Sequence, residues 1–566
     1  MQPTKPLIKD LLKIVMSSLL ALFLVPLIAW LFIRHALPTE AARLVANPFT
    51  TLWQFQVVGQ VSATALIAGV GILLVICALA AAAFRNRRTQ YLSFVIGWRL
   101  LIAFCAVEVV VQGVLLVWLA YWLTAFFFNS YYPKLIGIAA LLAAVGIFYT
   151  IVCIFKRVPQ TMNVEGQLIE DGHASALWAH IRELSTKAGT APPDYIIAGI
   201  DTNFFVTESP LRVQEQVLSG RALFVSLPLL RLLDREESNA VLMHELAHFR
   251  GGDTTSSAML GPKLVQYDYY CAMMQSAGVL LVFYVLRLYR VIFEFALKRD
   301  SRDREFIADR TAATLVSAQG IVRALIKIGA YAHYRDVIEQ KLFAEAGPHN
   351  NQIGIANHIN NGLVPYAESP DFLDAMKASS IPHPFDSHPA LKERMRNVSY
   401  EVSASDYSNI VTQTTRSTWI SDIQNADVIE QNLWAVYEQQ FASAHEQQLA
   451  YRYLPATEAE RDIVLKYFPP IEFILKGDQR IVVSYEGMML PKENAIVSWD
   501  NVTDLKYNSA DFGSDNFLIT HPEKGRFGAK TTKVGLPGIG KQELQLRSVM
   551  GQYWQRHQIM RKSQND

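Results

Sequence analysis

Four long apolar runs dominate the first 155 residues of the chain. They cover residues 14–33, 61–84, 100–128 and 135–155, and Glu108 in the third run is their single charged residue. About 20 apolar residues are enough for a helix to cross the hydrocarbon core of a bilayer. We therefore predict four spans in a transmembrane region over residues 1–157. The first run is too long for a cleaved signal peptide and lacks a small-residue cleavage site, which indicates a retained span.

Basic residues are distributed unevenly among the segments that flank these runs. Three segments are rich in them: the N-terminus (Lys5, Lys9 and Lys13), the second loop (Arg85, Arg87, Arg88 and Arg99) and the segment after the fourth run (Lys156 and Arg157). The alternate loops hold fewer, namely Arg34, Arg43 and Lys134. Cytoplasmic loops carry an excess of Lys and Arg. The N-terminus and everything after the fourth span are therefore expected in the cytoplasm.

Amphipathic helical patterns replace the apolar runs in the middle of the chain. Residues Leu227–Phe249 have apolar positions at helical spacing and are predicted to form one helix, and Ser301–Ala313 is helical in pattern as well. Between them lies an insert, at about residues 256–298, whose apolar stretch is too short to span a bilayer. We expect it to form a long amphipathic or re-entrant helix against the membrane, with a fifth span or a soluble core helix as alternatives.

Short β patterns fill the C-terminal part. A helix is predicted over Asp422–Tyr453, and Pro469-Pro470 then interrupts the chain. Seven short runs typical of strands follow, separated by turn residues, at 472–475, 481–485, 487–490, 495–499, 502–507, 516–520 and 532–536. An amphipathic helix is expected over Lys541–Gln558. This order predicts a small, partly open barrel capped by one helix.

The segment His244-Glu245-Leu246-Ala247-His248 supplies candidate chemistry. In a helix, residues i and i+4 lie one above the other, so both imidazoles can reach one metal ion. Glu245 is one position further round, close enough to polarise a water molecule at that metal. This is the H-E-x-x-H pattern of zinc proteases, and the alternative is a surface helix with two unrelated histidines.

A catalytic zinc site needs a third protein ligand. Glu305, in the helical segment Ser301–Ala313, is the best candidate, and Asp309 lies four residues later on the same face. A carboxylate there can accept the second N–H of a ligand histidine and fix its tautomer. The alternative for both residues is a solvated, charged helix face.

These segments together resemble the HtpX-like membrane zinc metallopeptidases, the family that also contains the CAAX prenyl proteases. Its members share H-E-x-x-H, a distant E-x-x-x-D helix and a His-Pro segment that leads into a helix, which here is Ser387–Met395. The segment Asn203-Phe204-Phe205 is similar to the family's Asn-Ala-Phe strand, although its second residue is not small. The segment Gly220–Ser226 resembles the strand that leads into the metal helix. The resemblance covers about residues 160–400.

The apolar runs, the resemblance and the β patterns together predict the fold and the domain order. We expect an α-helical transmembrane bundle, a mainly α (α+β) zincin-type metallopeptidase domain over residues 158–455, and a small β-rich domain over residues 470–566. The sequence from Gly487 to Thr503 is similar to sequences of PH-like bacterial domains. The sequence does not indicate the function of this C-terminal domain, and its expected partner is a protein or a lipid.

Composition agrees with a protein that is partly in a membrane. Hydrophobic residues make up 51% of the chain and charged residues 18%, and the formal net charge of +1 gives no indication of nucleic-acid binding. The four cysteines lie in apolar stretches without metal-ligand spacing, so buried small side chains are expected: Cys77, Cys105, Cys153 and Cys271. Glu108 is either a functional intramembrane carboxylate or a polar residue facing the bundle or the interface.

Further site residues follow from the expected reaction. Glu245 would act as the general base, and the oxyanion needs a donor besides the metal. His388 is the best candidate and Arg394 a weaker one. By analogy with relatives, His388 is alternatively a fourth ligand, and a plain His-Pro turn is also open. His383-Pro384 is expected to be a loop. The backbone around Asn203–Val206 is a candidate edge strand for pairing with extended substrate.

The sequence therefore predicts a zinc endopeptidase, with one zinc ion per chain, that cleaves membrane or misfolded proteins in protein quality control. We expect a multi-pass protein of the bacterial inner membrane whose partners are a peptide substrate and the lipid bilayer. A CAAX-type processing protease is one alternative, although those relatives carry more spans. An inactive membrane scaffold is the other, but the intact ligands and Glu245 argue against it.

Overall fold

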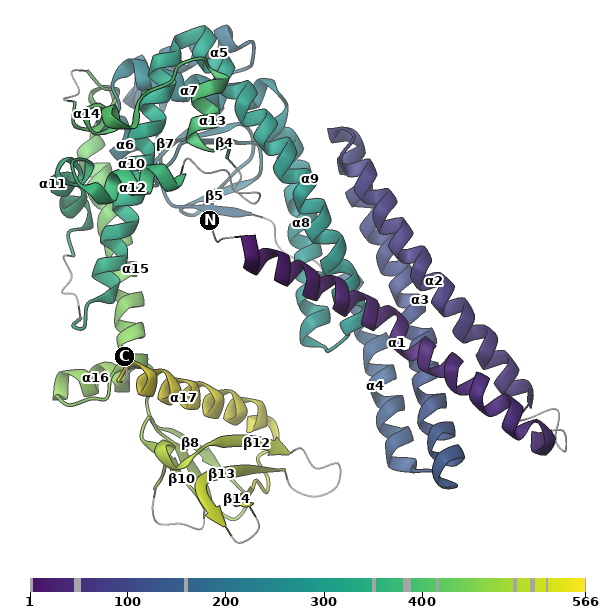
Figure 1. Ribbon diagram of the computed structural model, residues 1–566. Helices are drawn as coiled ribbons and strands as arrows, with labels where there is room; N and C mark the ends of the chain where they lie inside the picture. The colour runs from purple at the N-terminus through teal and green to yellow at the C-terminus, as the bar shows by residue number, and fades with distance from the viewer. Residues whose placement is uncertain are drawn as a thin grey trace. The chain divides into compact units, whose positions relative to one another are not determined.

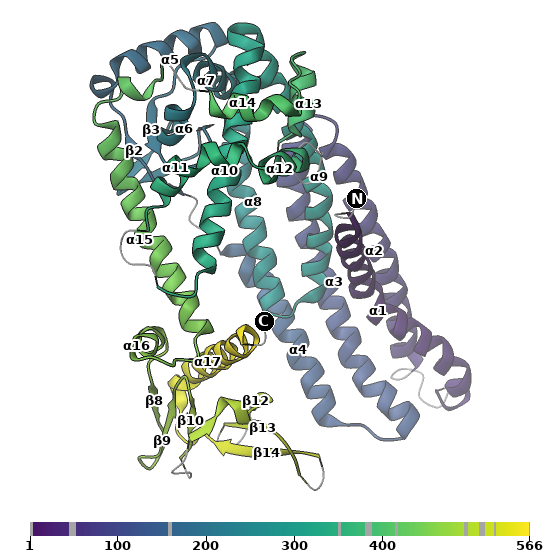
Figure 2. The ribbon, with the colours of Figure 1, turned by 60° about the vertical axis from the view of Figure 1, so that its left-hand side comes forward.

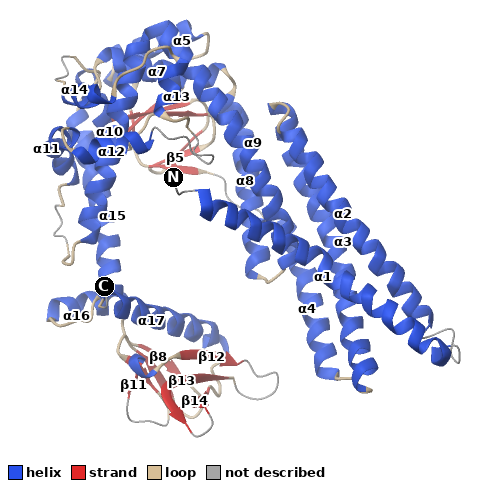
Figure 3. Cartoon of the chain, in the orientation of Figure 1, coloured by secondary structure: helices blue, strands red, loops and turns tan. Residues whose placement is uncertain are grey.

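The computed structural model describes residues 4–44, 52–156, 161–348, 353–379, 388–413, 417–491, 496–508, 515–525 and 528–564. The chain forms two compact units. The first comprises Met1–Ala332 and Val364–Glu430, and the second comprises His333–Leu363 and Gln431–Asp566. Helices make up most of the first unit, as Figure 3 shows in blue. The domain bounds expected from the sequence stay a prediction.

Four apolar helices open the chain: α1 (Thr4–Leu44), α2 (Trp53–Ala83), α3 (Arg87–Phe128) and α4 (Pro133–Val152) (Figure 1). Each contains a segment that is long and apolar enough to cross a membrane, so the four predicted apolar helices are confirmed. Asn86 fixes the start of α3. Its side-chain oxygen accepts a hydrogen bond from the backbone N–H of Thr89, and the hydroxyl of Thr89 accepts one from the backbone N–H of Asn86. Pro133 begins α4, where its missing N–H costs nothing.

The first unit also contains two small sheets. The larger has the order β2 (Gln167–Leu168), β3 (Tyr195–Gly199), β7 (Ala222–Ser226) and β4 (Phe205–Thr207). The central pair β3 and β7 is parallel, and β4 runs antiparallel to β7 at the edge. The smaller sheet has the order β1 (Met162–Val164), β5 (Leu211–Val213) and β6 (Gln216–Leu218). The predicted edge strand is therefore present, but it begins at Phe205.

The segment Leu227–Phe249 is two helices, so the prediction of a single helix was wrong. The structure has α6 (Leu227–Leu232) and α7 (Arg235–Arg250), and Leu233 between them is extended. The break has a local cause, because Asp234 caps α7. Its side chain accepts from the backbone N–H of Glu237 at 2.8 Å, and Glu237 accepts from the N–H of Asp234 at 2.9 Å. This reciprocal capping favours a new helix start over continuation of α6.

The insert after α7 forms a helical hairpin. Its arms are α8 (Asp253–Ser276) and α9 (Leu280–Ala312), and they meet at a turn in which Gly278 has a φ of +71°. A single long helix was expected there, and Gly278 ends it because a left-handed backbone suits glycine. Neither arm is among the four helices, of those described, that are apolar enough to span a membrane.

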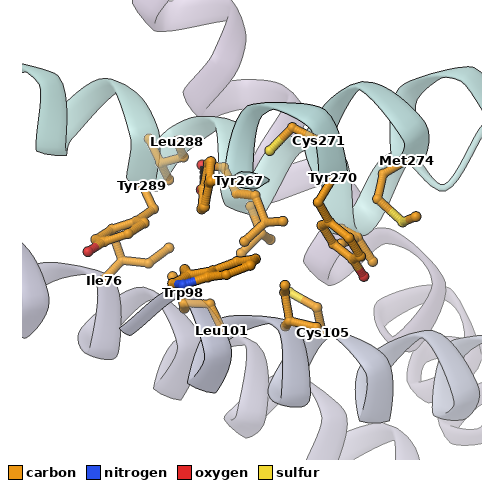
Figure 4. Packing of buried hydrophobic residues seen from close by; sticks show 14 of the residues in the cluster. Ile76, Trp98, Leu101, Cys105, Tyr267, Tyr270, Cys271, Met274, Leu288 and Tyr289 are labelled. Carbon is orange, nitrogen blue, oxygen red and sulfur yellow. Dashed lines mark hydrogen bonds between the residues drawn. The ribbon is translucent and has the colours of Figure 1, made fainter. Parts of the chain in front are cut away.

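The hairpin packs against the spanning helices (Figures 2 and 4). One buried cluster joins Trp98 of α3, Ile76 of α2, Tyr267 of α8 and Tyr289 of α9. Hydrogen bonds cross the same contact: the Tyr289 hydroxyl donates to the carbonyl oxygen of Ser93 at 3.1 Å, and the Tyr270 hydroxyl donates to that of Thr150 at 2.9 Å. The hairpin is therefore built onto the membrane helices. This excludes a separate soluble core helix and leaves its depth in the bilayer a prediction.

Two polar features of the membrane helices were left open by the sequence. Glu108 is buried inside the bundle and accepts a hydrogen bond from the amide of Gln112 at 3.4 Å, which favours a bundle-facing role. All four cysteines are free thiols. Three of them are buried as expected, whereas Cys77 is exposed because it lies on an outward-facing side of α2.

Helices complete the peptidase part and lead into the second unit. A π-helical segment (Ala313–Ser317) joins α9 to α10 (Ala318–Ala344). The remaining helices are α5 (Ser175–Ala188), α11 (Ile355–Ala367), α12 (Pro370–Ser379), α13 (Leu391–Asn397), α14 (Tyr407–Thr412), α15 (Ala426–Arg452) and α16 (Glu458–Tyr467). The predicted helix over 422–453 corresponds to α15.

The second unit holds the β-rich part. One antiparallel sheet has the order β11 (Ile496–Ser498), β10 (Gly487–Met489), β9 (Arg480–Val483) and β8 (Ile471–Ile474). The other consists of β12 (Asp504–Asn508), β13 (Asn516–Gly525) and β14 (Gly528–Gly535). Helix α17 (Glu543–Ser563) packs its buried face, including Leu546 and Tyr553, into the same core as Trp499 and Phe517. The seven strands and the closing helix are confirmed, and the PH-like assignment stays a prediction.

A buried charge network holds α7 in place, and it predicts a loss of stability. The carboxylate of Glu237 accepts from Lys327 at 2.7 Å and from Arg323 at 3.0 Å, and both Glu237 and Lys327 are 1% exposed. Glu237→Ala should lower the free energy of unfolding by about 3–5 kcal/mol, because it leaves a buried ammonium group without its partner.

Thermal unfolding of the detergent-solubilised protein measures this effect. Glu236→Ala is the matched control, since Glu236 is the exposed neighbour on the same turn and surface changes of this kind stay within about 0.5 kcal/mol. Equal unfolding temperatures for the two variants would contradict the stabilising role of the network.

Candidate metal centre

The two histidines of the H-E-x-x-H segment lie on successive turns of α7. His244 is buried and His248 is half-buried, and their Nε2 atoms are 3.3 Å apart. The Nε2 atoms of both rings therefore point to one common position, where a metal ion could lie. The buried Glu237, about two turns before His244 on the same helix, is bound by Lys327, so the histidines project from a fixed support.

Glu305 comes to the same place from α9. Its Oε2 lies 3.6 Å from Nε2 of His244, and its Oε1 lies 3.5 Å from Nε2 of His248. The three ligand atoms fall within 4.8 Å of one another. Zinc bonds of about 2.0–2.1 Å in tetrahedral geometry place their ligand atoms about 3.3–3.4 Å apart. The two histidine nitrogens have that spacing, and each lies at a similar distance from one of the two Glu305 oxygens, so the donor set fits a zinc ion.

Asp309, one turn after Glu305, supports the first histidine. Its Oδ1 is 2.9 Å from Nδ1 of His244, on the side of the ring away from Glu305. Arg394 of α13 binds the same carboxylate through both oxygens, at 2.6 and 2.8 Å, and all three groups are buried. Bidentate pairing fixes the plane of a carboxylate. The order Arg394, Asp309, His244 therefore sets the orientation of the ring.

Asp253 gives the second histidine the same kind of support, and sequence reasoning missed it. Its Oδ2 lies 3.0 Å from Nδ1 of His248, at the start of α8. Gly252, with a φ of +66°, turns the chain sharply after α7 and brings Asp253 back beside the ring. The signal was an acid five residues after the second histidine, just past a Gly-Gly turn.

The carboxyl groups of the site differ in their proton affinity. Burial raises the pKa of the Glu245 carboxyl above its ordinary value, although His244 and His248 counteract the effect. Burial acts in the same direction on Glu305, but hydrogen bonds to His244 and His388 and the nearby charge of Arg394 outweigh it and lower its pKa. Glu305 is therefore held as an anion suited to a cation, whereas Glu245 is better suited to take up a proton.

His388 lies against the ligand set from the outside. Its Nδ1 is 2.8 Å from Oε2 of Glu305, and its side chain is 66% exposed. The segment that contains His383-Pro384 and Ser387 lies outside the described residues. Ala390 directly precedes α13. The carboxylate of Glu393 in α13 accepts a hydrogen bond of 2.7 Å from Arg302 of α9. The His-Pro segment therefore leads into a helix, as the sequence predicted, and the structure adds that this helix is tied to α9.

The two residues considered for substrate contact lie in different surroundings. Asn203 is exposed, two residues before the edge strand β4. Arg394 is buried, and its guanidinium is occupied by Asp309 and lies 3.7 Å from Glu305. This geometry favours a role for Arg394 in fixing carboxylates over direct contact with substrate.

Comparison with known proteins agrees with this site. Residues 215–402 match the model of peptidase family M48, and this range contains all the ligand candidates. A protease HtpX homolog of Pelotomaculum thermopropionicum is 25% identical over 251 residues, which are 41% of this chain and 77% of the relative. One of Thermococcus kodakarensis is 25% identical over 260 residues (42% and 78%). One of Listeria monocytogenes serotype 4b is 25% identical over 304 residues (48% and 87%).

No solved structure matches this chain. The relatives share the name of a protease, the family model matches the segment that carries the site, and the candidate ligands come together there. The apolar helices place the chain in a membrane. Residues 215–402 of the chain therefore match peptidase family M48, and up to about half of the chain is similar to protease HtpX homologs.

Proposed function

We propose that this chain is a zinc-dependent endopeptidase with one zinc ion held by His244, His248 and Glu305. The observation that carries the proposal is the convergence of the three side chains, whose ligand atoms lie within 4.8 Å of one another and whose two histidine nitrogens are 3.3 Å apart. Three protein ligands leave a fourth position open, which is the arrangement of catalytic rather than structural zinc sites. When bound, zinc supplies Lewis-acid activation of a water molecule and of the scissile carbonyl.

Glu245 is the proposed general base. It takes a proton from the attacking water molecule and later returns it to the leaving amine, so one carboxyl group serves both halves of the reaction. The burial that raises its pKa supports this role, because a proton acceptor works best when its pKa approaches the working pH. Asp309 and Asp253 keep the two histidine rings in the tautomer that leaves Nε2 free for the metal.

His388 is the proposed donor to the oxyanion. It is exposed on the open side of the site and contacts Glu305, so a small rotation of its ring brings an N–H toward substrate. The same position is also suited to a fourth ligand that closes the resting site. His388→Ala separates the two roles: hydrolysis slows if the residue donates to the oxyanion, and it speeds up if the residue blocks the site. The backbone of β4, preceded by Asn203, is the proposed edge for extended substrate.

Purified protein in detergent tests the activity on an unfolded model substrate such as casein. We expect digestion that a zinc chelator stops. Natural substrates are proposed to be membrane or misfolded proteins. A comparison of membrane protein fragments between a wild-type strain and a Glu245→Gln strain identifies them, since true substrates lose their fragments in the variant. A cellular function that survives Glu245→Gln would instead favour a scaffold.

The catalytic domain is proposed to face the cytoplasm of a bacterial cell, at the inner membrane. The support is the excess of basic residues in alternate loops. A cytoplasmic reporter fused after Arg157, which lies outside the described residues, should be active, and an alkaline phosphatase fused near Arg43 should be active from the other side. Phosphatase activity from the fusion after Arg157 would reverse this orientation.

We also propose the domain division that the sequence suggested: residues 1–157 as the membrane region, 158–455 as the peptidase domain and 470–566 as a PH-like domain. The support for the last is the two antiparallel sheets followed by α17. A protein or lipid partner for that domain is a proposal of the same kind.

A further inference from the structure

Arg87 is the first residue of the spanning helix α3, yet its side chain reaches the metal centre. Its Nη1 lies 2.5 Å from Oδ1 of Asp253 and donates a hydrogen bond of 2.8 Å to the carbonyl oxygen of Gly251. Its Nε is 3.6 Å from the carboxylate of Asp300 on α9. One guanidinium group therefore contacts the end of α7, the start of α8 and the side of α9.

The contact with Asp253 continues to the metal ligand. The other oxygen of Asp253 is 3.0 Å from Nδ1 of His248, so this carboxylate stands between the arginine and the imidazole. The Asp253 side chain is only 10% exposed. Two partners on its two oxygens leave it little freedom to rotate, and Arg87 places its positive charge against the carboxylate that faces His248.

The backbone of Arg87, in α3, is itself held in a fixed position relative to the metal site. Helix α3 packs on α9 through Phe94 and Phe293, whose ring centroids are 4.7 Å apart, and through the hydrogen bond from Tyr289 to Ser93. Helix α9 then continues to Glu305, the third ligand. The packing of the membrane helices thus determines where the guanidinium group lies.

We propose that Arg87 is a positioning residue that links the spanning helix α3 to the metal ligand His248 through Asp253. This role rests on the proposed metal site. It makes retention of the metal depend on a residue of the membrane region, outside the segment 215–402 that matches the peptidase family. Groups that bond a metal-bound histidine directly, as Asp253 is placed to do, typically change metal affinity by about 10- to 100-fold. This range is therefore the largest effect that the loss of Arg87 can have through Asp253.

Zinc dissociation constants of full-length variants in detergent test the proposal. Arg87→Ala should bind zinc about 10- to 100-fold more weakly than wild type, and the absorption spectrum of its cobalt-loaded form should shift because His248 is no longer held. Arg88→Ala is the matched control. Arg88 is the adjacent, exposed arginine, for which no ion pair is found among the described residues, and its loss should leave both readouts unchanged.

A double-mutant cycle shows whether Arg87 acts through Asp253. If it does, Arg87→Ala should have little further effect on zinc affinity in an Asp253→Asn background. Additive losses would overturn the link. Wild-type affinity in Arg87→Ala would overturn it as well, while the proposed zinc site would stand. A wild-type protein that binds no zinc would overturn the proposed function and this role together.

Chemical rescue separates positioning from folding. The Arg87 side chain is 35% exposed and lines a cavity of about 540 Å³ with Arg88, Ser256 and Arg304. Added guanidinium ions can therefore reach the space vacated in Arg87→Ala. They should restore zinc affinity at concentrations that do not improve Arg88→Ala, and Arg87→Lys should lie between Arg87→Ala and wild type because it keeps the charge without the fork. A folded Arg87→Ala protein that guanidinium does not rescue would contradict the proposal. If the alanine variant does not fold, Arg87→Lys is compared with wild type instead, and wild-type zinc affinity in Arg87→Lys would contradict the proposal.

Discussion

Glu245→Gln is expected to slow hydrolysis by about two to four orders of magnitude, the usual contribution of a general base. Glutamine keeps the shape and the hydrogen-bonding capacity of the side chain but cannot take a proton from water. Glu245 is not among the three residues whose ligand atoms converge, so zinc content should stay near that of wild type. The rate of casein digestion and the zinc content of the same preparation measure the two effects together.

The matched control for this substitution is Glu236→Gln. Glu236 lies on the same helix, α7, and it is exposed near the first turn, away from the metal ligands. It should keep full activity. A Glu245→Gln protein that digests casein at the wild-type rate, in a preparation free of contaminating protease, would contradict the role of Glu245 as base.

Glu305→Ala is expected to remove zinc from the protein. The substitution deletes one of three ligands and leaves the buried Arg394 facing the histidines without part of its compensating charge. His244→Ala and His248→Ala should have the same effect, whereas wild type should hold about one zinc ion per chain. Metal analysis of the purified variants, at equal protein concentration, measures the loss.

Asp303→Ala provides the comparison on the same helix. Asp303 is exposed, two residues before Glu305, and it should retain both zinc and activity. Full zinc and full activity in Glu305→Ala would contradict its role as a ligand. In that case Asp309, the next carboxylate on this face of α9, would be the residue to substitute.

The parts of this site that could be predicted from the sequence are pairs of residues spaced four apart on one helix. His244 and His248 are four residues apart on one helix, as are Glu305 and Asp309, and helical geometry alone puts each pair on one face. The spans were predictable for a similar reason, because length and apolar character determine whether a helix can cross a bilayer.

Other features depend on local capping, on a turn or on long-range packing, none of which is visible in helical periodicity. The break before α7 depends on Asp234 and Glu237 capping each other, although both lie in a run with unbroken helical periodicity. The role of Asp253 depends on the left-handed turn at Gly252. Arg87 is 164 residues from Gly251, whose carbonyl oxygen it binds. In the sequence, the positive charge of Arg87 indicated only the orientation of the membrane helices. The packing of α3 on α9 brings Arg87 to the metal centre.

The most direct test of the account is the hydrolysis rate of the metal-free protein as zinc is added back. We expect no digestion of casein at the start and a rise that reaches its maximum at about one zinc ion per chain. The same titration of Glu245→Gln should show binding with the same stoichiometry and no comparable rise in rate. Casein digestion by the metal-free wild-type protein at its full rate, unchanged by added zinc, would contradict the proposal that His244, His248 and Glu305 form a catalytic zinc site.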